Sequence, residues 1–217
     1  MELSRHLLDL LYPPKCPFCG RLLERGEDGL CAQCQQVLPW TRAADGKEVG
    51  HCAACLSPLW YQDGVREAVH RYKFDDGMVH AAVFGKLMAQ CLNDRQERPA
   101  DLIVWVPLHP ARRRERGFDQ AELLARRVGE LTGLPVISAL GKVRRTGAQS
   151  QIQDESARWA NVEGVYALRP EAAAVAGMHV VLVDDVATSG ATLAQCAALL
   201  RQTGAESVTA LTLARAR

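Results

Sequence analysis

The chain has 217 residues, enough for one or two domains at a typical ~150 residues each. Hydrophobic residues make up 48% and charged residues 24% of the chain, which excludes an intrinsically disordered protein. The 26 basic and 25 acidic side chains leave a net charge of +1, which argues against a protein that coats nucleic acid through bulk charge. Six of the eight cysteines fall within the first 55 residues, so the composition indicates two unlike parts.

The first residues lack the features of a secretory signal. Glu2 and Asp9 interrupt the apolar stretch, whereas a signal needs an unbroken apolar run of about 7–15 residues. No window of the sequence approaches the ~18 apolar residues of a membrane span. We therefore expect a cytoplasmic protein with reduced thiols. We also expect a short amphipathic helix with four leucines on its buried face, at Leu7, Leu8, Leu10 and Leu11.

Three Cys-x-x-Cys pairs follow, and this spacing lets a tight turn direct both sulfurs at one metal ion. A polar linker with two glycines joins the first two pairs, as in a ribbon hairpin, and Gly20 suits the turn after the first pair. All four positions of a tetrahedral ion would be taken by protein ligands, so the ion would have a structural role. The sequence predicts one structural Zn²⁺ held by Cys16, Cys19, Cys31 and Cys34.

The third pair, Cys52 and Cys55, has no assigned partners. His51 or His70 could complete a second site, although neither spacing is typical of one. An interleaved arrangement, in which the third pair joins one of the earlier pairs, stays open. The cysteine pattern ends near Tyr61, so we predict a zinc-ribbon module at residues 1–60 and a second domain at residues 61–217.

The second part begins with alternating helical and strand patterns. Helical periodicity covers residues 65–74 and 79–92, and the apolar run 102–108 predicts a buried strand. Residues 121–133 predict an amphipathic helix that stops at a glycine, and residues 134–140 predict a second strand.

The C-terminal third carries the strongest strand pattern. Residues 141–164 are polar and predict a long loop, which could close over a site as a lid. Residues 179–186 are continuously apolar, as in a central parallel strand, and are followed by a helix at 192–205 and a strand at 207–214. Strands that alternate with helices predict an α/β fold with a parallel sheet. Cys91 and Cys196 lie on apolar helix faces and are expected in the core.

The loop after the central strand has the composition of an anion site. Ligands of open α/β sheets bind beyond the carboxyl ends of strands, and successive amides that lead into a helix form an anion cradle. The acidic pair Asp184 and Asp185 would repel a phosphate, so its targets should be hydroxyls or a cation. The alternative is a capped turn without a ligand. The predicted cradle consists of Ala187, Thr188, Ser189, Gly190, Ala191 and Thr192.

The segment VVLVDDVATSGATL resembles the phosphoribosyl-pyrophosphate (PRPP) motif of type I phosphoribosyltransferases. The resemblance implies that the acidic pair, the expected catalytic residues, holds the ribose hydroxyls, that the cradle holds the 5-phosphate, and that Mg²⁺ lies on the diphosphate. Together with the blocks at 106–125 and 144–166 and the cysteine pairs, the chain resembles the ComF family of competence-associated proteins over nearly its whole length. This implies a type I phosphoribosyltransferase-like parallel sheet flanked by helices, with a small N-terminal zinc-ribbon module.

Two departures from the family pattern matter. Members commonly carry a fourth Cys-x-x-Cys pair, which is absent here and leaves the third pair without a clear role. Ser189 stands where a second threonine is common, and Asp119 stands where asparagine is frequent. The first departure keeps a hydroxyl, and the second adds a negative charge beside an arginine-rich segment.

A basic segment could face the same ligand. Residues 112–145 hold nine basic and four acidic side chains, a local charge of +5. Arginine suits phosphate oxygens, and by resemblance this arginine loop occupies the pyrophosphate position, with a lysine from the Tyr-Lys-Phe segment. Solvated charge is the alternative for any single arginine. The expected ligand-binding residues are Arg113, Arg114, Arg116 and Lys73.

Three functions fit these features. The first, and favoured, is a competence protein that handles incoming single-stranded DNA or docks a competence helicase and keeps a PRPP site. Trp40, Trp60 and Phe18 could stack on a single strand, although the first sixty residues hold six basic and seven acidic side chains. The second is an active phosphoribosyltransferase that uses PRPP and Mg²⁺. The third is an adaptor that senses PRPP or a nucleotide.

Overall fold

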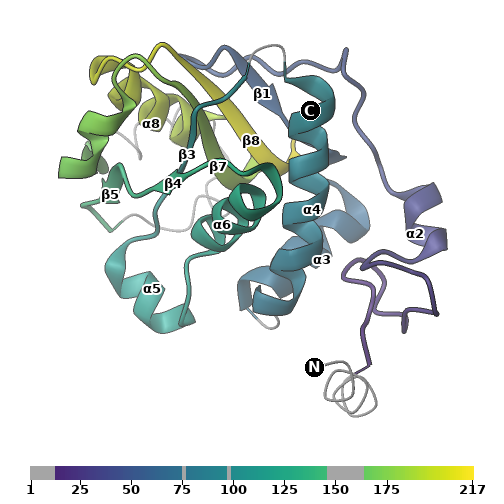
Figure 1. Ribbon diagram of the computed structural model, residues 1–217. Helices are drawn as coiled ribbons and strands as arrows, with labels where there is room; N and C mark the ends of the chain where they lie inside the picture. Colours follow the sequence, from purple (N-terminus) through teal and green to yellow (C-terminus); the bar gives the residue numbers. More distant parts are fainter. Residues whose placement is uncertain (1–12, 75–76, 97–98, 146–163) are drawn as a thin grey trace.

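The computed structural model describes residues 13–74, 77–96, 99–145 and 164–217 (Figure 1). The predicted N-terminal helix at Leu7–Leu11 and most of the predicted loop at 141–164 lie outside the described residues. Among the described residues, no helix combines the length and apolar character needed to cross a bilayer.

A parallel sheet forms the centre of the fold, with strand order β1-β8-β7-β3-β4. Its strands are β1 (Ala54–Leu56), β3 (Leu102–Trp105), β4 (Val136–Ile137), β7 (His179–Ala187) and β8 (Ser207–Arg215). All the pairs along this order are parallel, and the short strand β2 (Leu59–Trp60) also pairs with β8. The sheet confirms the predicted α/β class, with β7 as its most extensively paired interior strand.

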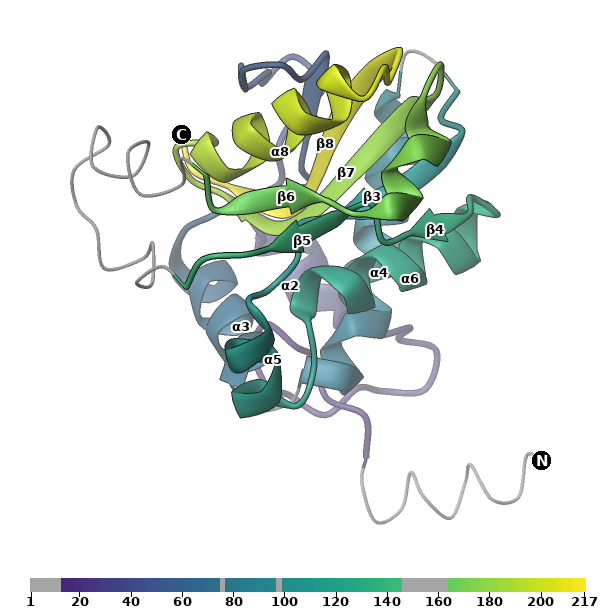
Figure 2. The same ribbon diagram turned by 90° about the vertical axis from the view of Figure 1, so that its left-hand side faces the viewer.

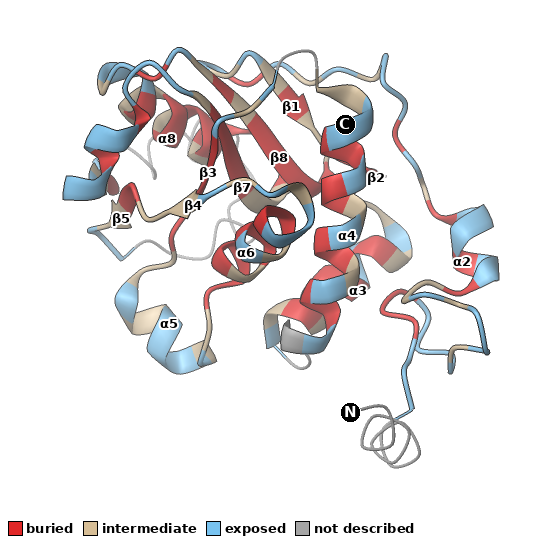
Figure 3. Cartoon of the chain, in the orientation of Figure 1, coloured by how far each residue is buried: buried red, intermediate tan, exposed pale blue. Residues whose placement is uncertain are grey.

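Helices cover both faces of the sheet because β7 and β8 are apolar on both sides (Figures 1 and 2). Val181 and Val183 of β7 belong to one buried cluster, together with α4 (Gly77–Arg95) and α6 (Gln120–Thr132). The alternate residues Val180 and Leu182 belong to a second cluster with α8 (Ala191–Gln202). Figure 3 shows the resulting pattern, with buried strands between helices that are buried only on their inner sides.

The remaining elements are shorter. They are α2 (Ala32–Val37), α3 (Asp63–Phe74), α5 (Pro110–Arg116) and the 3-10 helix η2 (Pro170–Val175). The predicted arginine loop is therefore partly helical: Pro110 stands in the first turn of α5, and Gly117 ends it with a φ of 79°.

The predicted strand at 134–140 is divided between two sheets. Only Val136 and Ile137 join the main sheet as β4, while β5 (Leu140–Lys142) pairs antiparallel with β6 (Tyr166–Leu168). The predicted loop at 141–164 thus starts within β5, and its sequence ends just before β6. The pairing of β5 with β6 therefore brings together the parts of the chain on either side of this predicted loop.

The segment before residue 60 contributes to the main sheet. Strand β1 lies before residue 60 and strand β2 ends at it, and both strands pair with β8 near the C-terminus. A buried hydrogen bond of 2.7 Å between the Ser57 and Thr212 hydroxyls adds to this contact. The proposed boundary after residue 60 therefore lies among sheet residues, and the part that stands apart from the sheet is the ribbon with α2 (Figure 1).

Candidate functional site

The acidic pair lies at the carboxyl end of β7, as the sequence predicts. Asp184 and Asp185 are half-buried, and the Asp185 amide donates to Asp184 Oδ1 at 2.8 Å. The chain then turns into α8 through Gly190, whose φ of 82° is left-handed. One recess is lined by Asp184 and by the whole predicted cradle, Ala187, Thr188, Ser189, Gly190, Ala191 and Thr192, with two apolar neighbours, Val186 and Leu193. The structure thus brings the cradle and one of the acidic side chains together.

The acidic pair is electrostatically unusual. Burial raises the pKa of Asp184 to about 8, and the charge of the neighbouring Asp185 adds to the rise. Lys73 from α3 offsets part of this, because its Nζ lies 2.9 Å from the Asp185 carboxylate. Burial alone would lower the pKa of Lys73, but Asp185 more than compensates and the pKa is raised. Lys73 is therefore a resident counter-charge of the acidic pair.

The predicted arginines do not all reach this site. Arg116 does approach it: its guanidinium lies 4.7 Å from the Phe74 ring centroid, next to Lys73 in sequence, and its charge interacts with Asp185. Arg113 instead forms a 3.0 Å ion pair with Glu122 of α6, and Arg114 is exposed. All three arginines belong to α5, and residues one or two apart in a helix do not face each other, so Arg114 does not share a face with Arg113 or Arg116.

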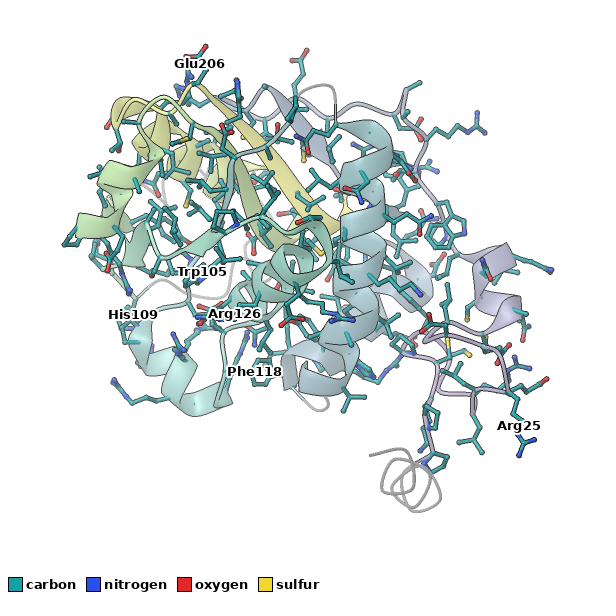
Figure 4. All side chains as sticks on the ribbon, in the orientation of Figure 1. Arg25, Trp105, His109, Phe118, Arg126 and Glu206 are labelled. Carbon is teal, nitrogen blue, oxygen red and sulfur yellow. The ribbon has the colours of Figure 1, made fainter. Side chains whose placement is uncertain are left out.

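Asp119, the unusual residue beside the arginines, is a helix cap. Its carboxylate accepts the Glu122 amide at 3.2 Å and the Leu108 amide at 2.7 Å, and the side chain is buried. The added negative charge thus lies at the start of α6. Figure 4 shows His109, which caps α5, together with Phe118 and Arg126 on this α5–α6 side of the molecule.

Sequence reasoning did not single out Tyr166. It lies on β6, is buried, and its hydroxyl hydrogen-bonds the Thr192 side chain at the start of α8. Lys142 on β5 lies 5.2 Å above the Tyr166 ring, and its charge interacts with Asp184. Burial lowers the pKa of Lys142, although Asp184 opposes this. Only the antiparallel pairing of β5 with β6 places these residues beside the cradle, and two three-residue strands leave no periodic signal in the sequence.

The four predicted zinc ligands converge. The sulfurs of Cys16, Cys19, Cys31 and Cys34 all lie within 4.8 Å of one another. Those of Cys19 and Cys31 are 3.7 Å apart, and ligands about 2.3 Å from a tetrahedral Zn²⁺ are separated by roughly 3.8 Å. Gly20 closes the first turn with a left-handed φ of 76°. The residues present therefore fit one structural Zn²⁺.

The third pair lies elsewhere. Cys55 is on β1 and belongs to the buried core cluster on the α8 side of the sheet. Cys52 is partly buried and packs against that cluster. Among the described residues, no third His, Cys, Asp or Glu converges on them, and His70 stacks on Phe74 with ring centroids 4.7 Å apart. Burial raises the pKa of Cys52 to about 12. Neither the second site nor the interleaved one is formed by the described residues. Cys91 and Cys196 are buried, as predicted.

The zinc ribbon packs on the helix that carries Lys73. Arg71 of α3 donates from Nη2 to the carbonyls of Pro17 and Phe18, at 2.8 and 3.0 Å. The Phe18 ring packs 5.5 Å from Phe84 of α4, centroid to centroid. The first cysteine turn and the acidic pair therefore contact the same helix, α3, from different sides.

Comparisons with known proteins match both parts of the chain. The double zinc ribbon domain matches residues 7–65, and the phosphoribosyl transferase domain matches residues 114–217. The chain is 28% identical to "Competence protein F" of Haemophilus influenzae, over 93% of this chain and 97% of that protein. It is 32% identical to "DNA utilization protein YhgH" of Salmonella typhi, over 92% of this chain and 89% of that protein.

Among solved structures, the PRPP amidotransferase of B. subtilis, complexed with ADP and GMP, matches 64% of this chain at 27% identity and a TM-score of 0.43. This match spans 29% of that larger enzyme. The two domains, and the relatives that match over nearly their whole length, place this chain in the ComF family, in which a double zinc ribbon precedes a phosphoribosyltransferase-like domain.

Proposed function

We propose that this protein acts in natural transformation, where it handles incoming single-stranded DNA, and that its phosphoribosyltransferase-like domain binds PRPP. The relatives named for competence and for DNA utilization support the first part. The second part is supported by one observation above all: Asp184 and the cradle at residues 187–192 line one recess where β7 passes into α8.

The cradle suits a 5-phosphate. Its main-chain amides lead into the positive end of the α8 dipole, and Thr188, Ser189 and Thr192 add hydroxyl donors. The neighbouring carboxylates suit ribose hydroxyls, which donate hydrogen bonds. In this arrangement, Asp184 and Asp185 accept from the 2- and 3-hydroxyls and orient the sugar, while the phosphate is held at the helix.

The carboxylates also suit a hard cation, and Mg²⁺ bound to the diphosphate would supply charge neutralisation there. A cation bound there would favour the charged form of Asp184, whose pKa burial and the neighbouring Asp185 raise. Lys73 is released from Asp185 for the diphosphate oxygens, and Arg116 supplies a second cation close by.

For DNA, the basic segment at 112–145 offers the phosphate contacts. Arg114 is exposed, whereas Arg113 and Arg126 share Glu122 as an acidic partner. Phosphate contacts release counterions, so binding of a single strand should weaken steeply with salt. Reversing the charges of Arg113 and Arg114 should flatten this dependence, and an unchanged slope would exclude this surface. In this role, a competence helicase would be a protein partner of the chain.

The donor site is tested by thermal shift with PRPP and Mg²⁺. We expect stabilisation of the wild type and none for the Asp184→Asn/Asp185→Asn variant; equal shifts would reject the assignment. Pyrophosphate release with a panel of nucleobases then distinguishes an enzyme that turns PRPP over from a protein that only binds it. A transformation assay that compares folded Asp185→Ala and Cys16→Ser variants tests whether the ligand site or the ribbon is needed for DNA uptake.

A further inference from the structure

A second and larger cavity lies along the edge of the sheet at β1. Its volume is about 1200 Å³, and its walls come from residues 42–56, the end of α4 with Ala100, the first residues of β7 and β8, and Arg215 at the last position of β8. It shares no lining residue with the recess at the cradle. Glu206, labelled in Figure 4, marks the end of the sheet where β8 begins, whereas the cradle follows the opposite end of β7. The cavity is larger than an inorganic anion needs and lies just above the ~300–1,000 Å³ typical of small-molecule and cofactor sites.

The lining of this cavity is strongly basic. Among the described residues, four cationic side chains, Arg42, Lys47, Arg95 and Arg215, line it against a single acidic one, Glu48. In the described parts of the chain, none of the four cations forms an ion pair with a carboxylate. This contrasts with the net charge of only +1 for the whole protein.

Two of these cations are fixed in place by uncharged groups. Arg95 donates to the Thr41 hydroxyl and carbonyl, both at 2.6 Å. Arg215 is 2% exposed, donates to the carbonyls of Cys55 and Asp45, and lies 4.9 Å over the Trp60 ring. Its Nε is buried and has no hydrogen-bond partner. A buried guanidinium without a contacting carboxylate is unfavourable, and an anion in the adjoining cavity would relieve this.

The other two cations are available at the rim. Arg42 is exposed, and Lys47 is half-buried and donates to the Ala216 carbonyl at 3.4 Å. The nearby Asp45 carboxylate accepts the main-chain amide of Arg42, and its charge also acts on Arg215. Further inside, His179 Nδ1 and Ser207 Oγ form a 2.8 Å pair that offers uncharged hydrogen-bonding groups.

We propose that this cavity is a second ligand site, which binds the phosphate of a nucleotide through Arg42 and Lys47 and takes its sugar and base against the first residues of β7 and β8. The nucleotide is either free or part of a single strand. This site is separate from the donor site described above and does not depend on PRPP binding there.

The test measures binding of two probes in EDTA, which removes magnesium. ATP is titrated by calorimetry, and a fluorescent twelve-nucleotide single strand is titrated by anisotropy. The test variant is Arg42→Ala/Lys47→Ala. The control is Lys15→Ala/Arg25→Ala, which removes the same charge from the ribbon, where Figure 4 shows Arg25. Circular dichroism melts confirm that both variants fold.

We expect the test variant to bind at least one probe about tenfold more weakly or worse, because a charge-assisted hydrogen bond contributes roughly that factor, and the control to bind as the wild type does. Loss of ATP binding identifies a free nucleotide, and loss of only the oligonucleotide identifies a strand. The proposal fails if neither probe binds, if both double variants behave alike, or if ribose 5-phosphate displaces ATP and thereby locates it in the cradle.

Discussion

The ion pair between Lys73 and Asp185 should contribute measurably to the free energy of unfolding, because it places a positive charge directly against one of the two neighbouring carboxylates. The Lys73 and Asp185 side chains are 25% and 14% exposed, so the pair lies between a surface pair and a buried one. Surface pairs contribute about 0–1 kcal/mol, and breaking a buried pair costs about 3–5 kcal/mol. We therefore expect Lys73→Met, which keeps the apolar stem, to lower the free energy of unfolding by about 2 kcal/mol.

A double-mutant cycle separates this pair from other effects of the substitution. Urea unfolding of Lys73→Met, Asp185→Asn and the double variant gives the coupling energy, and calorimetry should show a fall in Tm of about 4–8 °C for the single Lys73 variant. The double variant should lose little more than either single variant, because each substitution alone already removes the 2.9 Å contact. Additive losses, with a coupling energy below about 0.5 kcal/mol, would refute the assignment of Lys73 as the resident counter-charge.

Three further predictions concern other parts of the molecule. Cys34→Ser should abolish zinc binding in native mass spectrometry and lower Tm, whereas Cys52→Ser should retain one Zn²⁺, because only the first residue belongs to the convergent cluster. Gly190→Ala should cost about 1–2 kcal/mol in urea unfolding, because its φ is 82° and a Cβ would lie 3.1 Å from Val49 Cγ2; unchanged stability would contradict the left-handed turn. Asp184 has its pKa raised to about 8, so the folded state holds a proton that the unfolded state releases near pH 4; its contribution to stability is complete below that pH and is lost as the pH rises to about 8. Asp184→Asn should therefore gain stability relative to the wild type across this interval, and a parallel pH profile would contradict the raised pKa.

The sequence predicted the long elements well because their periodicity is local. The strand predicted at 179–186 is β7 at His179–Ala187, and the helix predicted at 121–133 is α6 at Gln120–Thr132. It failed where elements are short or pair at a distance. The strand predicted at 134–140 is divided between two sheets, and an apolar run of seven residues does not reveal which partner each part finds.

The candidate site shows the same division. Asp184 and the cradle lie within nine residues of sequence, so one motif sufficed to predict that they lie together. Lys73 and Asp185 are 112 residues apart, and the prediction of Lys73 came from resemblance. The expectation that Arg113 faces the ligand treated residues 110–116 as a loop, whereas helix formation turns Arg113 toward Glu122. Tyr166 gave no local signal.

By itself, the sequence determined the two parts of this protein, its four convergent cysteines and the loop that follows the central strand. Each depends on spacing within a few residues, which local backbone geometry converts directly into position. Only the tertiary structure decided that residues 54–60 join β8, that the ribbon packs on α3, and that a basic cavity forms at the edge of the sheet. These arrangements depend on which apolar faces and unpaired strand edges meet, a property of the whole chain that no single segment encodes.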